Sequence, residues 1–445
     1  MKLHLENIGL IQDATIEMQG ITVIAGENGT GKSTVGKALY AIFNSFYEVQ
    51  EQIGQERFQS IYNIIKIMYD FYLPRNKKIM NIHSYSIELL NKRDKYVKSP
   101  KKLKKNLKVT FGIDKDRSGS EIEQLAMDDF VRRIVESLKI SDEAILNSLI
   151  ARKLNTEFNN QLLNVFAEDR GKIVLNVQNE NLDIEVEQER VCANRLDFSL
   201  HTEAIYIDDP FVLDDIDIRL HRRPTRKYMD HMDYMDHMDY MDHMDYMDHI
   251  DHRDRLIRKL FYENRYTSIV DEIVFKKRFQ NIYGKLQNVC NGSIIQKKNG
   301  QMEYQFKNTD KSISVKNLSA GLKTFAILKK LLMNGKIEEN GTVILDEPEI
   351  HLHPAWQLQF AELIVLLSKE FGVNVLLNTH SPYFLRAIQV YSAKYEMADK
   401  CKYYMSKLVD DKKASIFDVS DDVDKIFEKL AQPLQVLENE RCNID

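Results

Sequence analysis

The spacing of apolar and polar residues along this chain predicts groups of strands separated by long helical stretches. Alternating residues predict two N-terminal strands that pair with each other, and the apolar run after them predicts a buried strand. Strands return after a long charged region and again near the C-terminus. The expected strands are Lys2–Ile8, Ala14–Met18, Ile21–Ala25, Lys172–Val177, Leu182–Val186, Ala204–Ile207, Val343–Leu345, Lys402–Val409 and Ala414–Val419. This order predicts a mixed α/β fold.

Apolar residues with a helical period predict helices between these strands. Residues 47–165 form an expected helical insertion with heavy charge, interrupted by a lysine-rich turn around Pro100. Farther along, Leu256–Val289 predicts amphipathic helices and Ser293–Phe306 a hairpin around Asn299-Gly300. One or two helices are expected from Asp421 onward. The other expected helices are Val35–Phe46, Ile122–Leu138, Asp142–Phe158 and Leu322–Met333.

A glycine-rich loop follows the apolar strand Ile21–Ala25 and opens a helix, which is the context of a phosphate-binding loop. Glycines let successive backbone N–H groups converge on phosphate oxygens, and the helix N-terminus adds positive potential. We expect Lys32 to bridge the β- and γ-phosphates and Ser33 to hold Mg²⁺. The residues expected to bind the nucleotide here are Gly26, Asn28, Gly29, Thr30, Gly31, Lys32, Ser33 and Thr34.

Two adjacent carboxylates end the apolar strand Val343–Leu345. A buried parallel strand that ends this way delivers Asp346 to the Mg²⁺ ion and Glu347 to a water in line with the γ-phosphate. The second carboxylate is expected to polarise the attacking water. The alternative, a solvated acidic turn, is disfavoured by the apolar strand before it.

The order of the glycine loop, the Leu318-Ser319-Ala320-Gly321 element, the acidic pair and a strand that ends in His380 resembles ATP-binding-cassette (ABC) ATPases. Their SMC/RecF/OLD-like branch, with the ATPase subunits of antiphage systems such as Septu and PARIS, is the most similar. Residues 349–354, Glu-Ile-His-Leu-His-Pro, look like its DEPExxLHP element, and Met1–Gly26 looks like its opening hairpin. The resemblance covers residues 1–45 and about 300–420.

The resemblance implies an ABC-type P-loop ATPase head with a mixed sheet, a helical insertion and a helical signature lobe. It implies ATP and Mg²⁺ as cofactors, and a homodimer or higher homo-oligomer in which Ser319 and Gly321 contact the γ-phosphate held by a second subunit. His380 would be the switch histidine on the γ-phosphate of its own subunit. No glutamine-loop residue can be assigned, and the candidates are Gln50, Gln52 and Gln55.

The domains expected from these motifs divide the chain into six segments. Residues 1–46 and 341–445 form the two ends of the ATPase core, and 166–215 its β-rich continuation. Residues 47–165 are the helical insertion, 216–255 a low-complexity linker and 256–340 the helical signature lobe.

Two functions follow from the resemblance. The first is a sensor or scaffold subunit of a bacterial antiphage defence system, with ATP clamping two subunits. Only about 65 residues follow His380, so we expect a nuclease or toxin activity to come from an effector protein encoded nearby. The alternative is an SMC/RecF-type ATPase in DNA repair or maintenance. A transporter ATPase fits worst, because Ala320 and Leu322-Lys323 depart from the LSGGQ form and about 285 residues separate Thr34 from Ser319.

Composition agrees with a cytoplasmic enzyme. The 445 residues are 43% hydrophobic and 29% charged, which can bury a substantial core, and no segment looks like a signal peptide or membrane span. The four widely spaced cysteines suggest neither a zinc site nor a disulfide framework. The formal charge of -5 argues against a chain that coats nucleic acid. A local cluster fits either a solvated turn or a nucleic-acid contact. It comprises Lys98, Lys101, Lys102, Lys104, Lys105 and Lys108.

A hexad repeat, Tyr-Met-Asp-His-Met-Asp, fills Tyr228–His252. Each step of three residues falls about 60° short of a helical turn, so the Met, Asp and aromatic stripes spiral around the axis. Such a segment has no single buried side, and it is expected to be a length-variable spacer, either a solvated helix or disordered. Its Asp and His residues do not converge on one ion, which disfavours a metal site.

Overall fold

The computed structural model describes residues 1–72, 81–113, 121–166, 170–178, 180–188, 190–195, 197–216, 250–261, 269–297 and 301–444. These residues divide into two compact units. The sheet unit contains residues 1–47, 150–216 and 250–444, and the helical unit contains residues 48–149. In the described part of the chain, no helix is long and apolar enough to cross a membrane.

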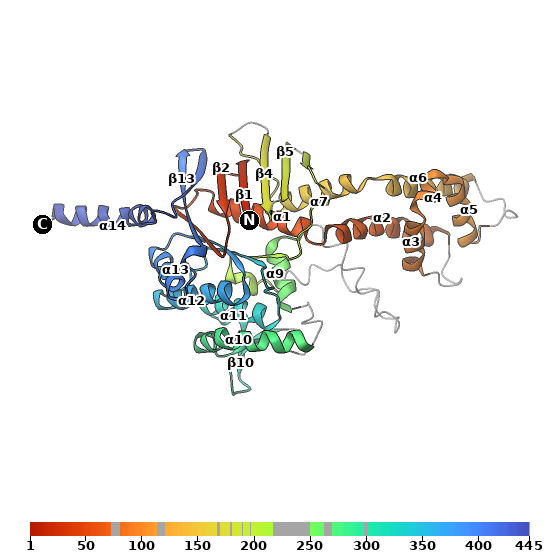
Figure 1. Cartoon of the computed structure of the whole chain (residues 1–445). Helices are drawn as coiled ribbons and strands as arrows, with labels where there is room; N and C mark the ends of the chain where they lie inside the picture. Colours follow the sequence, from red (N-terminus) through yellow and green to blue (C-terminus); the bar gives the residue numbers. More distant parts are fainter. Residues whose placement is uncertain are drawn as a thin grey trace. The chain divides into compact units, whose positions relative to one another are not determined.

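The sheet unit is built on a mixed sheet that has eleven strands among the described residues, in the order β6-β5-β4-β1-β2-β14-β13-β3-β12-β11-β7. Figure 1 labels β1, β2, β4, β5 and β13 of this sheet. The strands are β1 (Lys2–Ile8), β2 (Ile11–Glu17), β3 (Ile21–Gly26), β4 (Arg170–Val177), β5 (Glu180–Glu187), β6 (Arg190–Ala193), β7 (Ala204–Ile207), β11 (Thr342–Asp346), β12 (Asn374–Thr379), β13 (Cys401–Asp410) and β14 (Lys413–Asp418). A separate antiparallel sheet contains β8 (Ser293–Gln296), β9 (Met302–Gln305) and β10 (Ser312–Ser314).

Five neighbouring strands of the large sheet, β13, β3, β12, β11 and β7, are all parallel. Asp346 is level with Asn378 on β12, and Thr379 is level with Ala25 on β3. Because parallel strands end at the same edge of a sheet, the loops after β3, β7, β11 and β12 gather there. This edge is where ligands bind in open α/β sheets.

Helices cover both faces of these parallel strands. Helix α1 (Lys32–Phe46) packs on one face, where a side chain in place of Gly36 would meet Ile344 at 3.0 Å. The other face forms one core with helices that include α9 (His252–Phe261), α10 (Ile269–Val289), α11 (Ala320–Met333), α12 (Pro354–Phe371) and α13 (Pro382–Lys394). Helix α14 (Asp424–Ile444) follows β14. Short 3-10 helices are η1 (Pro210–Leu213), η3 (Val315–Asn317) and η4 (Ala398–Lys400).

The helical unit has its own apolar core, to which α2, α3, α4, α5 and α6 contribute. Its helices are α2 (Val49–Tyr72), α3 (Ile82–Asn91), α4 (Arg93–Lys98), α5 (Pro100–Thr110), α6 (Glu121–Lys139) and the start of α7 (Asp142–Glu157). Arg57 of α2 donates to the Ile140 carbonyl at 2.9 Å and pairs with Asp142.

The structure confirms the mixed α/β fold, and the predicted strands and helices recur within a few residues of their expected ends. The prediction of a lysine-rich turn around Pro100 was wrong, because residues 100–110 form helix α5. Proline is accepted in the first turn of a helix, and Leu103 and Leu107 are buried one turn apart. The hairpin tip Asn299-Gly300 lies outside the described residues.

The repeat lies almost entirely outside the described residues, which resume at Ile250. Helix α9 begins at His252, the last residue of the predicted repeat, so the helix starts inside the stretch assigned to a linker, 216–255. His252 is buried, with 7% of its surface exposed, and its Nδ1 contacts the Glu157 carboxylate. It is therefore part of the folded core and not of a solvated spacer.

Candidate functional site

The glycine loop connects β3 to α1 at the edge where the parallel strands end. Gly29 and Gly31 have positive φ values of 74° and 81°, which only glycine adopts without strain. A Cβ on Gly31 would lie 2.5 Å from Ile11 Cδ1, so this position also lacks room for a side chain. Helix α1 starts at Lys32 with no side-chain cap on its N-terminus, and its first N–H groups suit an anion.

Lys32 is buried, with 4% of its surface exposed, and its ammonium group bends back over the loop. Lys32 Nζ donates to the carbonyl oxygens of Gly26 at 3.0 Å and Glu27 at 2.8 Å. It also lies 3.3 Å from Glu347 Oε1. These contacts hold a positive charge between the glycine loop and the acidic pair.

Asp346 ends β11 and is held by the two strands beside it. Tyr206 Oη of β7 donates to Asp346 Oδ2 at 2.8 Å, and Asn378 Nδ2 of β12 donates to Oδ1 at 2.8 Å. Burial and the neighbouring Asp346 carboxylate raise the pKa of Tyr206, which therefore stays a donor. Both donors are neutral, so they orient the Asp346 carboxylate and leave its negative charge uncompensated.

Glu347 has a positive φ of 49°, an uncommon conformation for a residue with a side chain. Its N–H donates to the Asn378 carbonyl at 2.9 Å, which fixes the turn after β11. His380 Nδ1 lies 3.5 Å from the Glu347 carboxylate. This partner lowers the pKa of Glu347 despite partial burial, with further help from Lys32, and the same contact raises the pKa of His380.

Glu349 connects the segment after the acidic pair to the end of β12. Its buried carboxylate accepts hydrogen bonds from Thr379 Oγ1 and, at 3.1 Å, from the N–H of His380. Burial raises the pKa of Glu349, although these hydrogen bonds oppose the shift. We assign Glu349 a structural part in placing His380 beside Glu347.

A cavity of about 480 Å³ opens between the glycine loop and the acidic pair. This volume is in the usual range for a small-molecule site. The lining residues are Leu10, Asn28, Gly29, Thr30, Gly31, Lys32, Ser33, Thr34, Asp208, Asp346, Glu347 and Ile350. Most of the expected nucleotide and metal ligands thus surround one space, although their sequence positions lie far apart.

Residues 1–385 match the family model described as an AAA ATPase domain. The chain belongs to this family. It is therefore an ATP-binding ATPase. Among solved structures, the chain is similar to an SMC head domain from Thermotoga maritima, at 11% identity and a TM-score of 0.38 over 94% of this chain and 98% of that one. Another is an Smc head domain with an extended coiled coil, bound to the C-terminal domain of ScpA derived from Pyrococcus furiosus. It has 12% identity and a TM-score of 0.41 over 99% and 98% of the two chains.

Asp208 of the ATPase was not predicted as a site residue, yet it lines the cavity. A signal was present in the sequence, because Ile205-Tyr206-Ile207-Asp208-Asp209-Pro210 has the same pattern as the segment from Ile344 to Pro348, an apolar strand followed by two acids and proline. The two strands are parallel neighbours, with Ile207 level with Leu345. Tertiary pairing therefore gives Asp208 a place beside Asp346.

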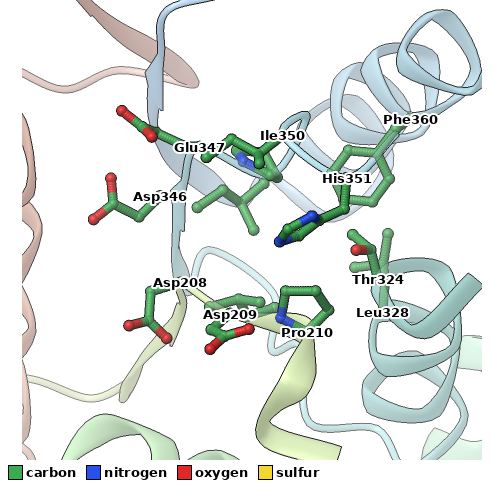
Figure 2. A pocket seen from close by; sticks show the side chains of 13 residues that line it. Asp208, Asp209, Pro210, Thr324, Leu328, Asp346, Glu347, Ile350, His351 and Phe360 are labelled. Carbon is green, nitrogen blue, oxygen red and sulfur yellow. The ribbon is translucent and has the colours of Figure 1, made fainter. Parts of the chain in front are cut away.

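A second, much smaller cavity of about 30 Å³ lies behind the acidic residues of the ATPase (Figure 2). Its lining joins the ends of β7 and β11 to the signature helix α11. The lining residues are Ile207, Asp208, Asp209, Pro210, Thr324, Leu328, Leu345, Asp346, Glu347, Pro348, Ile350, His351 and Phe360. The space is large enough for a water molecule and too small for a nucleotide.

The Leu-Ser-x-Gly element of the ATPase begins helix α11. Ser319 caps this helix, and its Oγ accepts a hydrogen bond from the Leu322 N–H at 3.4 Å. A Cβ on Gly321 would lie 3.0 Å from the His351 carbonyl and 3.1 Å from the Trp356 ring, which explains the glycine. Neither Ser319 nor Gly321 is among the residues that line the 480 Å³ cavity.

The remaining predicted positions differ in where the structure places them. His380 contacts Glu347 but does not line the cavity, and Gly26 lies directly before the loop residues that do. Gln50, Gln52 and Gln55 lie on α2 in the helical unit, and Gln55 donates to Glu51 at 3.0 Å. None of these three glutamines lines the cavity, so the structure supplies no support for a glutamine-loop residue among them.

Proposed function

We propose that this ATPase binds Mg²⁺-ATP in the cavity beside the glycine loop and hydrolyses it there. The observation that supports this best is the meeting of Lys32, Asp346 and Glu347 around one cavity of about 480 Å³. A cation for the phosphates, a carboxylate for the metal and a second carboxylate for water are the groups that ATP hydrolysis requires. The other loop residues expected around the phosphates are Gly26, Asn28, Gly29, Thr30, Gly31 and Thr34.

Ser33 and Asp346 are the side chains that would hold Mg²⁺, and both line the cavity. Mg²⁺ in nucleotide sites usually keeps several waters and takes one or two protein ligands together with phosphate oxygens. A dedicated cage is not needed, in agreement with the described residues, where no group of three or more His, Cys, Asp or Glu is arranged around a metal position. When bound, the ion would neutralise charge on the phosphates.

Glu347 would act as the base that polarises the attacking water. Its lowered pKa keeps the carboxylate ionised at neutral pH. The 3.3 Å pair with Lys32 would open when phosphates take over the ammonium group, which frees the carboxylate for water. His380, on the same carboxylate, would then contact the γ-phosphate and report its presence.

We further propose that the ATPase dimerises around ATP. Ser319 is exposed at the N-terminus of α11, where backbone N–H groups favour an anion. Because Ser319 and Gly321 are absent from the lining of the cavity in their own chain, they would complete the site of a second copy.

The biological role that we propose is a sensor or scaffold subunit of a cytoplasmic antiphage defence system. The ATP-dependent dimer would hold or release a separate effector, a nuclease or toxin encoded nearby. This step rests on the order of motifs in the sequence, from the glycine loop to His380. Phage plating on cells that carry the gene, with and without its neighbours, tests it directly.

An SMC/RecF-type role in DNA maintenance is the second candidate, and one observation favours it. Helix α5 buries Leu103 and Leu107 and leaves Lys101, Lys102 and Lys105 exposed. A basic helix face of this kind can neutralise phosphates of a duplex. Duplex binding that weakens steeply with salt, together with no effect on phage growth, would favour this role over defence.

The test of the ATPase proposal is hydrolysis and light scattering by the purified chain with Mg²⁺-ATP, and with ATP in EDTA. We expect hydrolysis and ATP-dependent association only with Mg²⁺. A chain that hydrolyses ATP equally well in EDTA would contradict the metal assignment. A chain that stays monomeric in ATP would contradict the dimer.

A further inference from the structure

Asp208 places a third acidic side chain on the cavity that the glycine loop and acidic pair form. It is the first residue after β7, and β7 is the parallel neighbour of β11. Figure 2 shows Asp208 and Asp346 at the ends of these neighbouring strands. The cavity therefore carries three carboxylates, and only two of them have a part in the proposed hydrolysis.

Two cations hold the Asp208 carboxylate. His252 Nε2 lies 3.1 Å from Asp208 Oδ2, and Arg253 Nη2 donates to the same oxygen at 2.6 Å. Arg253 Nε adds contacts of 3.1 and 3.0 Å to the two oxygens. Asp208 nevertheless keeps 18% of its side chain exposed, and it is among the residues that line the 480 Å³ cavity. The two cationic groups therefore fix the position of a carboxylate that remains partly exposed.

His252 lies between two carboxylates. Its Nδ1 contacts Glu157 Oε2 at 2.7 Å, and its backbone N–H donates to Glu157 Oε1 at 2.9 Å. Both ring nitrogens lie near carboxylate oxygens, which suits the imidazolium form, in which both nitrogens carry a proton. Glu157 is buried, with 2% of its side chain exposed. The imidazole ring therefore has one orientation, set by Glu157 and Asp208.

The same ring also supports Asp346. The His252 ring stacks on the Tyr206 ring, with centroids 4.4 Å apart and an angle of 25° between planes. Tyr206 in turn donates its hydroxyl proton to Asp346 Oδ2 at 2.8 Å. One imidazole thus reaches Asp208 by an ion pair of 3.1 Å and Asp346 through the stacked tyrosine.

We propose that Asp208 is a third acidic residue near the proposed Mg²⁺ position, beside Asp346. His252, held by Glu157, positions both Asp208 and Asp346. This inference rests on the proposed binding of Mg²⁺-ATP in the cavity. Partners behind metal ligands fix the ligand orientation, and their loss typically costs 10- to 100-fold in metal affinity. His252 and Glu157 would therefore set metal affinity without touching the metal.

A purely structural ion cluster is the competing explanation, and the chain contains a matched example. Glu203 is 9% exposed and pairs with Arg255 and Lys259 of the same helix α9. Glu203 does not line either cavity. A change at Glu203 therefore reports the cost of disturbing a buried ion cluster on α9 with no route to the metal.

The test compares Asp208→Asn, His252→Gln and Glu157→Gln with the parent and with Glu203→Gln, all as full chains. Mn²⁺ is the probe, because electron paramagnetic resonance measures its binding to the ATP complex without turnover. Affinity for ATP in EDTA and thermal unfolding are measured in parallel. We expect the first three variants to bind Mn²⁺ about tenfold more weakly in the ATP complex. ATP affinity in EDTA should stay within about twofold, because no metal is involved there. Glu203→Gln should change only the thermal unfolding.

Several outcomes would overturn the inference. If Asp208→Asn binds Mn²⁺ as tightly as the parent, Asp208 does not contribute to metal binding. If only His252→Gln and Glu157→Gln match the parent, the positioning role is wrong. An equal loss in Glu203→Gln would reduce the effect to general destabilisation. If one variant does not fold, the others still decide, because each removes a different group of the same network. A parent that binds no Mn²⁺ with ATP would instead contradict the proposed function.

Discussion

Glu347 Oε1 lies 3.3 Å from Lys32 Nζ, so the expected base and the expected phosphate cation neutralise each other in this structure. Both groups line the cavity of about 480 Å³. ATP would supply the negative charge that draws Lys32 away, and the carboxylate would become available only after the phosphates arrive. The pair therefore gives a physical reason why the site would not activate water before the nucleotide is bound.

The Lys32–Glu347 pair predicts different results when each of the two residues is changed. Glu347→Gln should retain ATP binding and lose most of the hydrolysis, by about 100-fold or more, because an amide cannot polarise water as a carboxylate does. The ATP-bound dimer should accumulate in this variant. Lys32→Ala should instead lose ATP binding. Single-turnover hydrolysis and nucleotide binding measure the two effects, and near-normal turnover in Glu347→Gln would remove Glu347 from the proposed mechanism.

The signature element predicts an effect on association alone. Ser319→Arg should fold and bind ATP as a monomer, because Ser319 is exposed and does not line its own cavity. It should not associate with ATP, since a bulky side chain would fill the place of the partner's γ-phosphate. Light scattering with and without ATP tests this. Ser319→Ala, which adds no bulk, is the matched control, and ATP-dependent dimers of Ser319→Arg would show that the signature assignment is wrong.

The ion pairs of Glu203 with Arg255 and Lys259 predict that the folded protein loses stability in acid. Its burial opposes the charge, but Arg255 and Lys259 outweigh burial and lower the pKa to about 2 from an ordinary 4.5. A lowered pKa stabilises the folded state above pH 4.5, and this stabilisation is lost as the pH falls through 4.5 toward 2. By pH 3 the loss should be roughly 2 kcal/mol. Denaturation of the parent and Glu203→Gln at pH 7 and pH 3 measures it. If the two proteins lose equal stability over this range, the ion cluster does not act as described.

The repeat predicts tolerance to a change in length. Removing Tyr234–Asp239 takes out one hexad. It should leave ATPase activity and folding nearly unchanged, because loop-closure entropy changes by only tenths of a kcal/mol. A parallel variant with the histidines of the repeat changed to Gln, but His252 kept, separates length from chemistry. Zinc- or pH-dependent activity that is lost only in the Gln variant would replace the spacer interpretation with a histidine sensor.

The sequence by itself determined the parts of this ATPase that depend on local order. The glycine loop needs a strand, small residues and a helix in succession, and residues 21–46 contain all three. The acidic pair needs only an apolar strand before it. Residue periodicity also located most helices and strands, because burial of one face leaves a regular trace in the sequence. It misplaced residues 100–110, where five lysines and a proline hid a helix that buries only Leu103 and Leu107.

Only the tertiary structure decided what surrounds Asp346. Tyr206 and Asn378 come from strands on either side of β11, and the sequence does not state which strands pair. His252 was assigned to the repeat because Asp251-His252 continues the hexad pattern. Its contacts to Glu157 and Asp208 exist because α7, β7 and α9 meet beside the parallel strands. Local pattern fixes which residues carry charge, whereas long-range packing decides which of those charges face one another.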